Sequence, residues 1–144
     1  MNRSVLSPVV RHEAGHLAMM AHHGMTWQAV WLSDTVAQIK GASPAPSPLA
    51  AASVAVAGAM AEGYELTARR FLRPRHGDPW GGDLRMLRHS VEERGTALLE
   101  LVKAGIDLAA EVLTPGEVTR WAEHIIAEDR ARTARIAAMF AQSA

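Results

Sequence analysis

The chain has 144 residues, 49% of them hydrophobic and 21% charged, with a formal net charge of zero. This length and composition predict a single domain over residues 1–144 with a helical, alanine-rich core. The balanced charge offers no basic field for nucleic acid, and the lack of cysteine excludes disulfides and thiolate metal ligands. No uncharged apolar stretch reaches the roughly 18 residues of a membrane span. We therefore expect a cytoplasmic protein without membrane or nucleic-acid partners.

The first predicted helix covers residues 8–23. Ser7 is a good N-cap, Pro8 suits the first helical position, and Gly24 is a natural stop. The residues between them are mostly good helix formers with a wide apolar face. This helix is therefore expected to be largely buried.

The centre of this helix carries the pattern His-Glu-x-x-His, with His12, Glu13 and His16. On a helix the two histidines lie one turn apart on the same face, where both can bind one metal ion. Glu13 would lie beside the ion and could accept a proton from its water. The alternative is an ordinary helix that happens to carry these residues. Burying such polar groups without a partner is costly, which favours a metal site.

Residues 27–39 are rich in β-formers and are interrupted by a turn signal at residues 33–35, Ser-Asp-Thr. We predict a short β-hairpin or two small edge strands here. A strand edge beside the motif helix could bind a peptide by strand addition. The alternative is that Trp27 and Trp31 only cover the core. Residues 41–48, with three prolines, are expected to form a loop.

A second helix is predicted from Pro48 to about Phe71. Its many small residues, including Gly58, should allow close packing on the motif helix. Glu62 lies in an otherwise apolar stretch of this helix. A buried carboxylate needs a partner, which could be a metal, a ligand histidine or an arginine.

Residues 69–82 are predicted to be a loop, and Asp83 to begin a third helix with a break near Gly95. An aspartate at a helix start is ordinarily an N-cap, so this role is the alternative to metal binding. Four arginines in the loop could bind nucleic acid, but the zero net charge favours a solvated loop. These arginines are Arg69, Arg70, Arg73 and Arg75.

The last helix is predicted to run from a capping box at residues 114–117 towards Phe140. Glu128 and Arg132 are spaced for a favourable pair one turn apart. We expect the motif core to span about residues 8–92. The helical part, about residues 96–142, is expected to be scaffold or an oligomer contact.

The third ligand of a catalytic zinc site, which ordinarily has three protein ligands and water, is not fixed by the motif itself. Glu62, Asp78, Asp83 and a further histidine are all candidates. His23 lies on roughly the same helix face as the motif but too far along to reach the same ion. A position near the negative end of the helix dipole is more favourable for it.

Three short motifs occur in order: HEAGH at residues 12–16, VAGAMAE at residues 56–62 and GGDL at residues 81–84. Over about residues 8–92 the chain thereby resembles the peptidase domain of the FtsH-type ATP-dependent zinc proteases. The resemblance implies a mainly α, HExxH zincin-like domain that binds zinc.

For the site, this resemblance implies that His12, His16 and Asp83 are the metal ligands and that Glu13 is the general base. Glu62 matches a glutamate that is not a ligand in that family. The alternative makes Glu62 the third ligand, as in the thermolysin-like pattern. A set of two histidines and a carboxylate also suits iron, so the identity of the metal stays open.

The function that we expect is that of a stand-alone zinc metalloendopeptidase. Without an ATPase module its substrates would be peptides, unfolded segments or one dedicated partner protein. The alternative is a catalytically inactive, FtsH-peptidase-like module that binds another protein. A homo-oligomer is compatible with either function.

Overall fold

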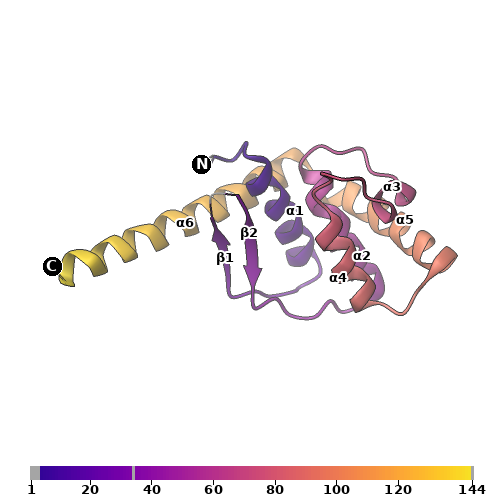
Figure 1. Cartoon of the computed structure of the whole chain (residues 1–144), viewed down its shortest axis with the longest axis horizontal. Coiled ribbons are helices and arrows are strands. Elements are labelled where there is room, and N and C mark those ends of the chain that lie inside the picture. Colours follow the sequence, from indigo (N-terminus) through magenta and orange to yellow (C-terminus); the bar gives the residue numbers. More distant parts are fainter. Residues whose placement is uncertain (1–3, 34, 144) are drawn as a thin grey trace.

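The computed structural model describes residues 4–33 and 35–143, which are mainly helical with one small sheet (Figure 1). The helices of this part of the chain are α1 (Pro8–His22), α2 (Pro48–Ala61), α3 (Ala68–Leu72), α4 (Gly81–Ser90), α5 (Gly95–Val112) and α6 (Pro115–Ser143). The strands are β1 (Ala29–Leu32) and β2 (Ala37–Lys40). The predicted mainly helical class is confirmed.

The two strands form the predicted antiparallel hairpin, with Val30 opposite Ile39 and Leu32 opposite Ala37. The predicted turn includes Asp34, which lies outside the described residues. Strand β1 contacts α6 and β2 contacts α1, so the hairpin lies between these two helices (Figure 1). This arrangement brings the hairpin next to the helix that carries the histidine motif.

Helix α1 packs closely on α2, as the small residues of both helices predicted. A Cβ atom on Gly15 would lie 2.3 Å from the carbonyl oxygen of Ala57 and 2.6 Å from the Cβ of Ala61. Such distances leave no room for any side chain at position 15. Glycine at position 15 of the HEAGH motif is therefore explained by packing, because α1 and α2 approach each other too closely there for an alanine.

Helix α2 is shorter than predicted, because it ends at Ala61 instead of continuing to about Phe71. Gly63 adopts a φ of 103°, and the N–H groups of Gly63 and Tyr64 donate to the carbonyls of Met60 and Ala59. This is the glycine-dependent Schellman end of a helix. The prediction failed because the apolar pattern continued past this glycine.

The predicted loop over residues 69–82 also needs correction, because the short helix α3 occupies its beginning. The Thr67 side chain caps this helix by accepting the N–H of Arg70 at 3.1 Å. A threonine cap preceding only five helical residues gives too weak a periodic pattern to be recognised in the sequence.

Asp83 is not the N-cap of the third predicted helix. Helix α4 begins at Gly81 with Trp80 in the capping position, so Asp83 is its third residue. The predicted break is present, since α4 ends at Ser90 and α5 begins at Gly95. Because the helix is interrupted before Gly95, Asp83 lies on a short helix of its own, α4.

Helix α6 starts where the capping box predicted, with Thr114 Oγ1 accepting the N–H of Glu117 at 3.2 Å. Its first half packs on α1 and β1, whereas its C-terminal half extends beyond the rest of the molecule (Figure 1). Among the described residues, no helix is both long enough and apolar enough to cross a membrane.

Candidate metal centre

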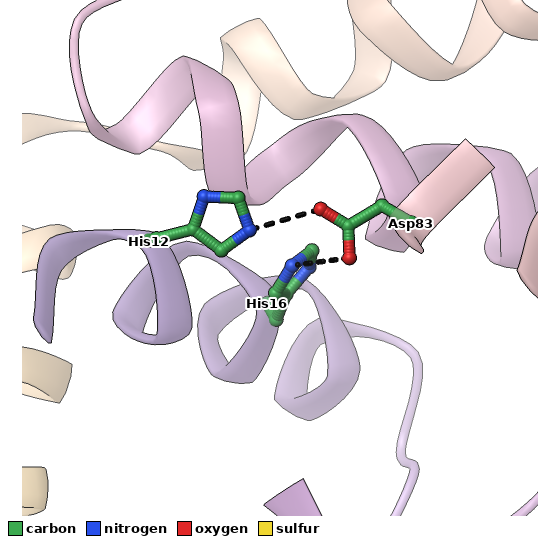
Figure 2. Close-up of side chains that lie close together, drawn as sticks. All are labelled: His12, His16 and Asp83. Carbon is green, nitrogen blue, oxygen red and sulfur yellow. Dashed lines mark hydrogen bonds and ion pairs between the residues drawn. The ribbon is translucent and has the colours of Figure 1, made fainter. Parts of the chain in front are cut away.

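The side chains of His12, His16 and Asp83 converge between α1 and the start of α4 (Figure 2). His12 Nε2 lies 2.9 Å from Asp83 Oδ2, and His16 Nε2 lies 3.1 Å from Asp83 Oδ1. One ligand atom from each of the three residues fits within 4.8 Å of the others. Two imidazole nitrogens and one carboxylate are a donor set that suits a divalent cation.

The opposite nitrogen of each histidine ring has its own acceptor. His12 Nδ1 lies 2.6 Å from Glu62 Oε2, and His16 Nδ1 lies 2.7 Å from the carbonyl oxygen of Val54. Because these acceptors hold a proton on Nδ1, Nε2 is the nitrogen that each ring can offer to a metal. Such outer contacts orient ligand histidines and increase their basicity.

Glu62, the alternative third ligand, is therefore separated from Asp83 by the His12 ring. Its carboxylate contacts Nδ1, whereas Asp83 contacts Nε2 of the same ring. One ion cannot be bound by His12 Nε2 and at the same time by a carboxylate that hydrogen-bonds to Nδ1. The position of Glu62 is that of a group that orients the ring, and its side chain is only 11% exposed.

Gly58 forms the floor of the centre, a role that the sequence analysis missed. A Cβ atom at this position would lie 2.5 Å from His12 Nε2 and 2.6 Å from His16 Nε2. Only glycine leaves the space in front of these two nitrogens open. A glycine inside a helix is unfavourable by itself, and this cost is the signal in the sequence from which a special role of Gly58 could have been inferred.

A metal ion fits these residues for a second reason, which is the state of His16 Nε2. This atom is buried and makes no well-oriented hydrogen bond within the described part of the chain, although Asp83 Oδ1 is 3.1 Å away. A buried polar atom without a proper partner is unfavourable. A cation held between His16 and Asp83 would satisfy both groups.

The charges of the cluster stabilise one another. Burial by itself would lower the pKa of His12, but its hydrogen bonds with Asp83 and Glu62 outweigh burial and raise that pKa to about 10. Burial likewise disfavours the charged form of His16, yet the charge of Asp83 raises the pKa of His16 overall. Without a metal, the cluster therefore retains protons that a metal would have to displace.

The pKa values of Asp83 and Glu13, two carboxyl groups close to these histidines, are shifted in opposite directions. Burial would raise the pKa of Asp83, but the charge of the nearby His16 and the hydrogen bond to His12 hold that pKa well below its usual range. Burial raises the pKa of Glu13, and the positive histidines only partly offset this effect. Asp83 is thus suited to bind a cation as an anion, and Glu13 is suited to exchange protons.

Glu13 lines a cavity of about 370 Å³ that is also lined by His12 and Asp83. The cavity lies between the start of α1, the beginning of β2 and the segment that leads into α4. Its apolar walls come from Val9, Val36, Ala37 and Pro79. A substrate in this cavity would contact Glu13 and the centre together.

The other candidates from the sequence lie away from the centre. His23 is the C-cap residue of α1, and its Nε2 lies 2.8 Å from the hydroxyl of Ser53 on α2. That hydroxyl donates to the carbonyl of Ala50, so it accepts a hydrogen bond from His23. The carboxylate of Asp78 is engaged by Arg70.

Comparison of the chain with models of protein families, with curated proteins and with solved structures found no match. The resemblance to FtsH-type peptidases therefore rests on the three motifs alone. All three motifs contribute to the centre: HEAGH on α1, Gly58 and Glu62 at α2, and Asp83 on α4.

Proposed function

We propose that this protein is a zinc-dependent metallopeptidase with a zincin-like HExxH centre. The observation that carries the proposal is the convergence of His12 Nε2, His16 Nε2 and the Asp83 carboxylate beside a cavity lined by Glu13. His12, His16 and Asp83 would hold the ion. When bound, zinc would act as a Lewis acid on the scissile carbonyl and lower the pKa of a water to about 7.

Glu13 is the general base in this mechanism. Its carboxylate accepts a proton from the attacking water and delivers that proton to the leaving amine nitrogen. The partial burial that raises its pKa brings it closer to neutral pH, which favours proton transfer in both directions.

The edge of β2 offers a way to align a peptide substrate. The N–H of Ser33 donates across the hairpin to the carbonyl of Val36, whereas the N–H of Val30 points away from β2 and donates to Glu128. These two hydrogen bonds show which residues of the hairpin direct their backbone groups to the other strand and which direct them outward. Given the register of the hairpin, the backbone groups of Ala37 and Ile39 point away from β1. Ala37 lines the cavity, so an extended peptide paired there would pass the centre.

Hydrolysis of casein and of a peptide library by the zinc-loaded protein tests this function. Glu13→Gln should retain zinc and lower kcat by about 10²–10⁴-fold, because only the proton acceptor is lost. Glu123→Gln on α6 is the matched control, since this exposed glutamate lies far from the centre in the sequence and should leave hydrolysis unchanged.

Two outcomes would count against the proposal. Unchanged turnover in Glu13→Gln would contradict the mechanism. Stoichiometric zinc binding without hydrolysis of any substrate would instead favour the alternative, an inactive module that binds a protein partner.

A further inference from the structure

The segment between α3 and α4 is closed by an ion pair between Arg70 and Asp78. The guanidinium group donates from Nη2 to Asp78 Oδ1 at 2.9 Å and from Nη1 to Asp78 Oδ2, so the contact is bidentate. Asp78 Oδ2 also accepts the backbone N–H of Arg75 at 2.6 Å. The side chain of Asp78 is only 10% exposed. The Asp78 carboxylate therefore holds its own part of the chain against Arg70 on α3 and against the backbone of Arg75.

Trp80 connects this ion pair to the start of α4. The Trp80 side chain is fully buried, and its Nε1–H donates to the carbonyl oxygen of Phe71 at 3.2 Å. The guanidinium carbon of Arg70 lies 4.8 Å from the centre of its ring, and the Tyr64 ring packs edge-on at 5.2 Å. Arg70 thus holds Asp78 through hydrogen bonds and Trp80 through a cation–π contact.

The position of Trp80 determines the position of Asp83. Trp80 is the capping residue of α4, and its carbonyl accepts the N–H of Leu84 at 2.9 Å to close the first helical turn. Asp83 lies within this turn, so a shift of Trp80 would move the Asp83 carboxylate with it. Pro79, between Asp78 and Trp80, also lines the cavity beside Glu13.

We propose that Arg70 and Asp78 are positioning residues that set the Asp83 carboxylate against His12 and His16. The inference rests on the proposed metal centre and adds to it two residues that bind neither metal nor substrate. It also gives a role to an arginine that the sequence assigned to a solvated loop.

The geometry favours this role over a purely stabilising one. A single ion pair whose arginine is still 27% exposed makes only a modest contribution to the stability of a fold. A metal site, by contrast, depends on ligands that are held to within about 0.5 Å. The histidines are fixed on α1 by Glu62 and Val54, whereas Asp83 depends on the first turn of a short helix.

Measuring the affinity of the full chain for Zn²⁺ and Co²⁺, together with the visible spectrum of bound Co²⁺, tests the inference. Arg70→Gln should weaken metal binding by about tenfold, the lower end of the effect of losing an outer contact of a ligand. Arg70→Lys should weaken it similarly, because lysine keeps the charge but lacks the planar fork. The Co²⁺ spectrum should change in both variants, because Asp83 no longer lies in one fixed position.

Arg69→Gln is the matched control, since Arg69 is the exposed neighbour on the same short helix. Asp78→Asn should reproduce the effect of Arg70→Gln, and the double variant should be no worse than either single one. Thermal unfolding of the metal-free proteins identifies any variant that fails to fold, and Arg70→Lys then replaces Arg70→Gln.

The outcomes separate this inference from the proposed function. If the wild type binds metal and the Arg70 variants bind it equally well with an unchanged Co²⁺ spectrum, the positioning role is wrong. An equal loss of affinity in Arg69→Gln would also overturn it. If the wild type binds neither ion, the proposed metal centre itself is wrong and the inference fails with it.

Discussion

His12 and His124 each lie near a carboxylate, but their surroundings differ in every other respect. The His12 side chain is 13% exposed and contacts Glu62 and Asp83, which are 50 and 71 residues away in the sequence. The His124 side chain is 50% exposed, and its Nε2 lies 4.0 Å from Glu128, one helical turn away. Convergence of distant elements and burial, rather than residue type, therefore distinguish the candidate centre from a solvated helix.

The same contrast separates the arginines of the two regions. Arg120 on α6 is 68% exposed and lies 3.5 Å from Glu117 on the same helix. Arg70 is 27% exposed and connects Asp78 with Trp80 across the segment before α4. Substitutions near the centre should therefore alter metal binding, whereas equivalent substitutions on α6 should not.

Asp83→Ala should have the largest effect. A structural zinc site with four ligands is worth about 10–16 kcal/mol, so one ligand is worth about 2.5–4 kcal/mol, or roughly two to three orders of magnitude in Kd. Elemental analysis and competition with a chelator measure the loss. Asp107→Ala on α5 is the control, because this position lies on a helix that does not carry the centre. Retention of stoichiometric zinc in Asp83→Ala would contradict the ligand assignment.

Gly58→Ala should close the centre without removing any ligand. Its Cβ would lie 2.5 Å from His12 Nε2, and the resulting overpacking of about 1–3 kcal/mol corresponds to roughly 5- to 150-fold weaker binding. Alanine favours a helix over glycine, so α2 itself should not be weakened.

Gly116→Ala on α6 is the matched control for Gly58→Ala, because its nearest neighbour would be 4.0 Å away. Zinc affinity in both variants is measured by the same chelator competition. Unaltered affinity in Gly58→Ala would mean that the ion does not lie in front of the two Nε2 atoms.

Glu62→Gln should weaken zinc binding by about 10–100-fold, the usual effect of removing a carboxylate that orients a ligand histidine. The amide can still accept the Nδ1–H of His12 but no longer supplies a charge. If Glu62 were the third ligand, its loss would instead match that of Asp83→Ala. Glu117→Gln on α6 controls for a general effect of charge.

The affinity for zinc should rise with pH, because binding displaces protons from the histidines. The contacts of His12 raise its pKa to about 10, so displacing the His12 proton should increase affinity about tenfold per pH unit below that value. Calorimetry in buffers of different ionisation enthalpy should detect about one to two protons released per ion at pH 7.

The same raised pKa predicts how stability depends on pH. A raised histidine pKa stabilises the fold fully below the unfolded value of 6.5, and this contribution is lost as pH rises through about 10. The metal-free protein should thus melt at a lower temperature at pH 9.5 than at pH 7. A metal-loaded sample should lose less, and an identical decrease in both samples would argue against metal binding at these histidines.

The sequence predicted the elements that depend on local signals. Ser7 and Pro8 mark the start of α1, Thr114 marks the start of α6, and the spacing of His12 and His16 places both rings on one helix face. These features need only the chemistry of neighbouring residues. The end of α2 at Gly63 was also a local signal, but the apolar pattern beyond it obscured the stop.

The contacts that complete the centre could not be predicted in this way. The carbonyl oxygen of Val54 accepts from His16 Nδ1 because α1 and α2 pack with one particular offset along their axes. No local pattern in the sequence specifies that offset. Asp83 was named from a resemblance, since its distance of 71 residues from His12 gives no periodic signal. Packing of α1 on α2 and the start of α4 at Trp80 decide both contacts, and these are properties of the whole fold.

His124→Ala should have the smallest effect and gives the sharpest form of the contrast with His12. A surface pair of this exposure contributes little, so the free energy of unfolding should change by less than about 0.5 kcal/mol. Zinc affinity and any peptidase activity should stay unchanged, whereas His12→Ala removes a ligand and should weaken zinc binding about as much as Asp83→Ala. Denaturant unfolding and chelator competition on the two variants make the measurement. A clear effect of His124→Ala on zinc affinity would contradict the assignment of the ion to His12, His16 and Asp83.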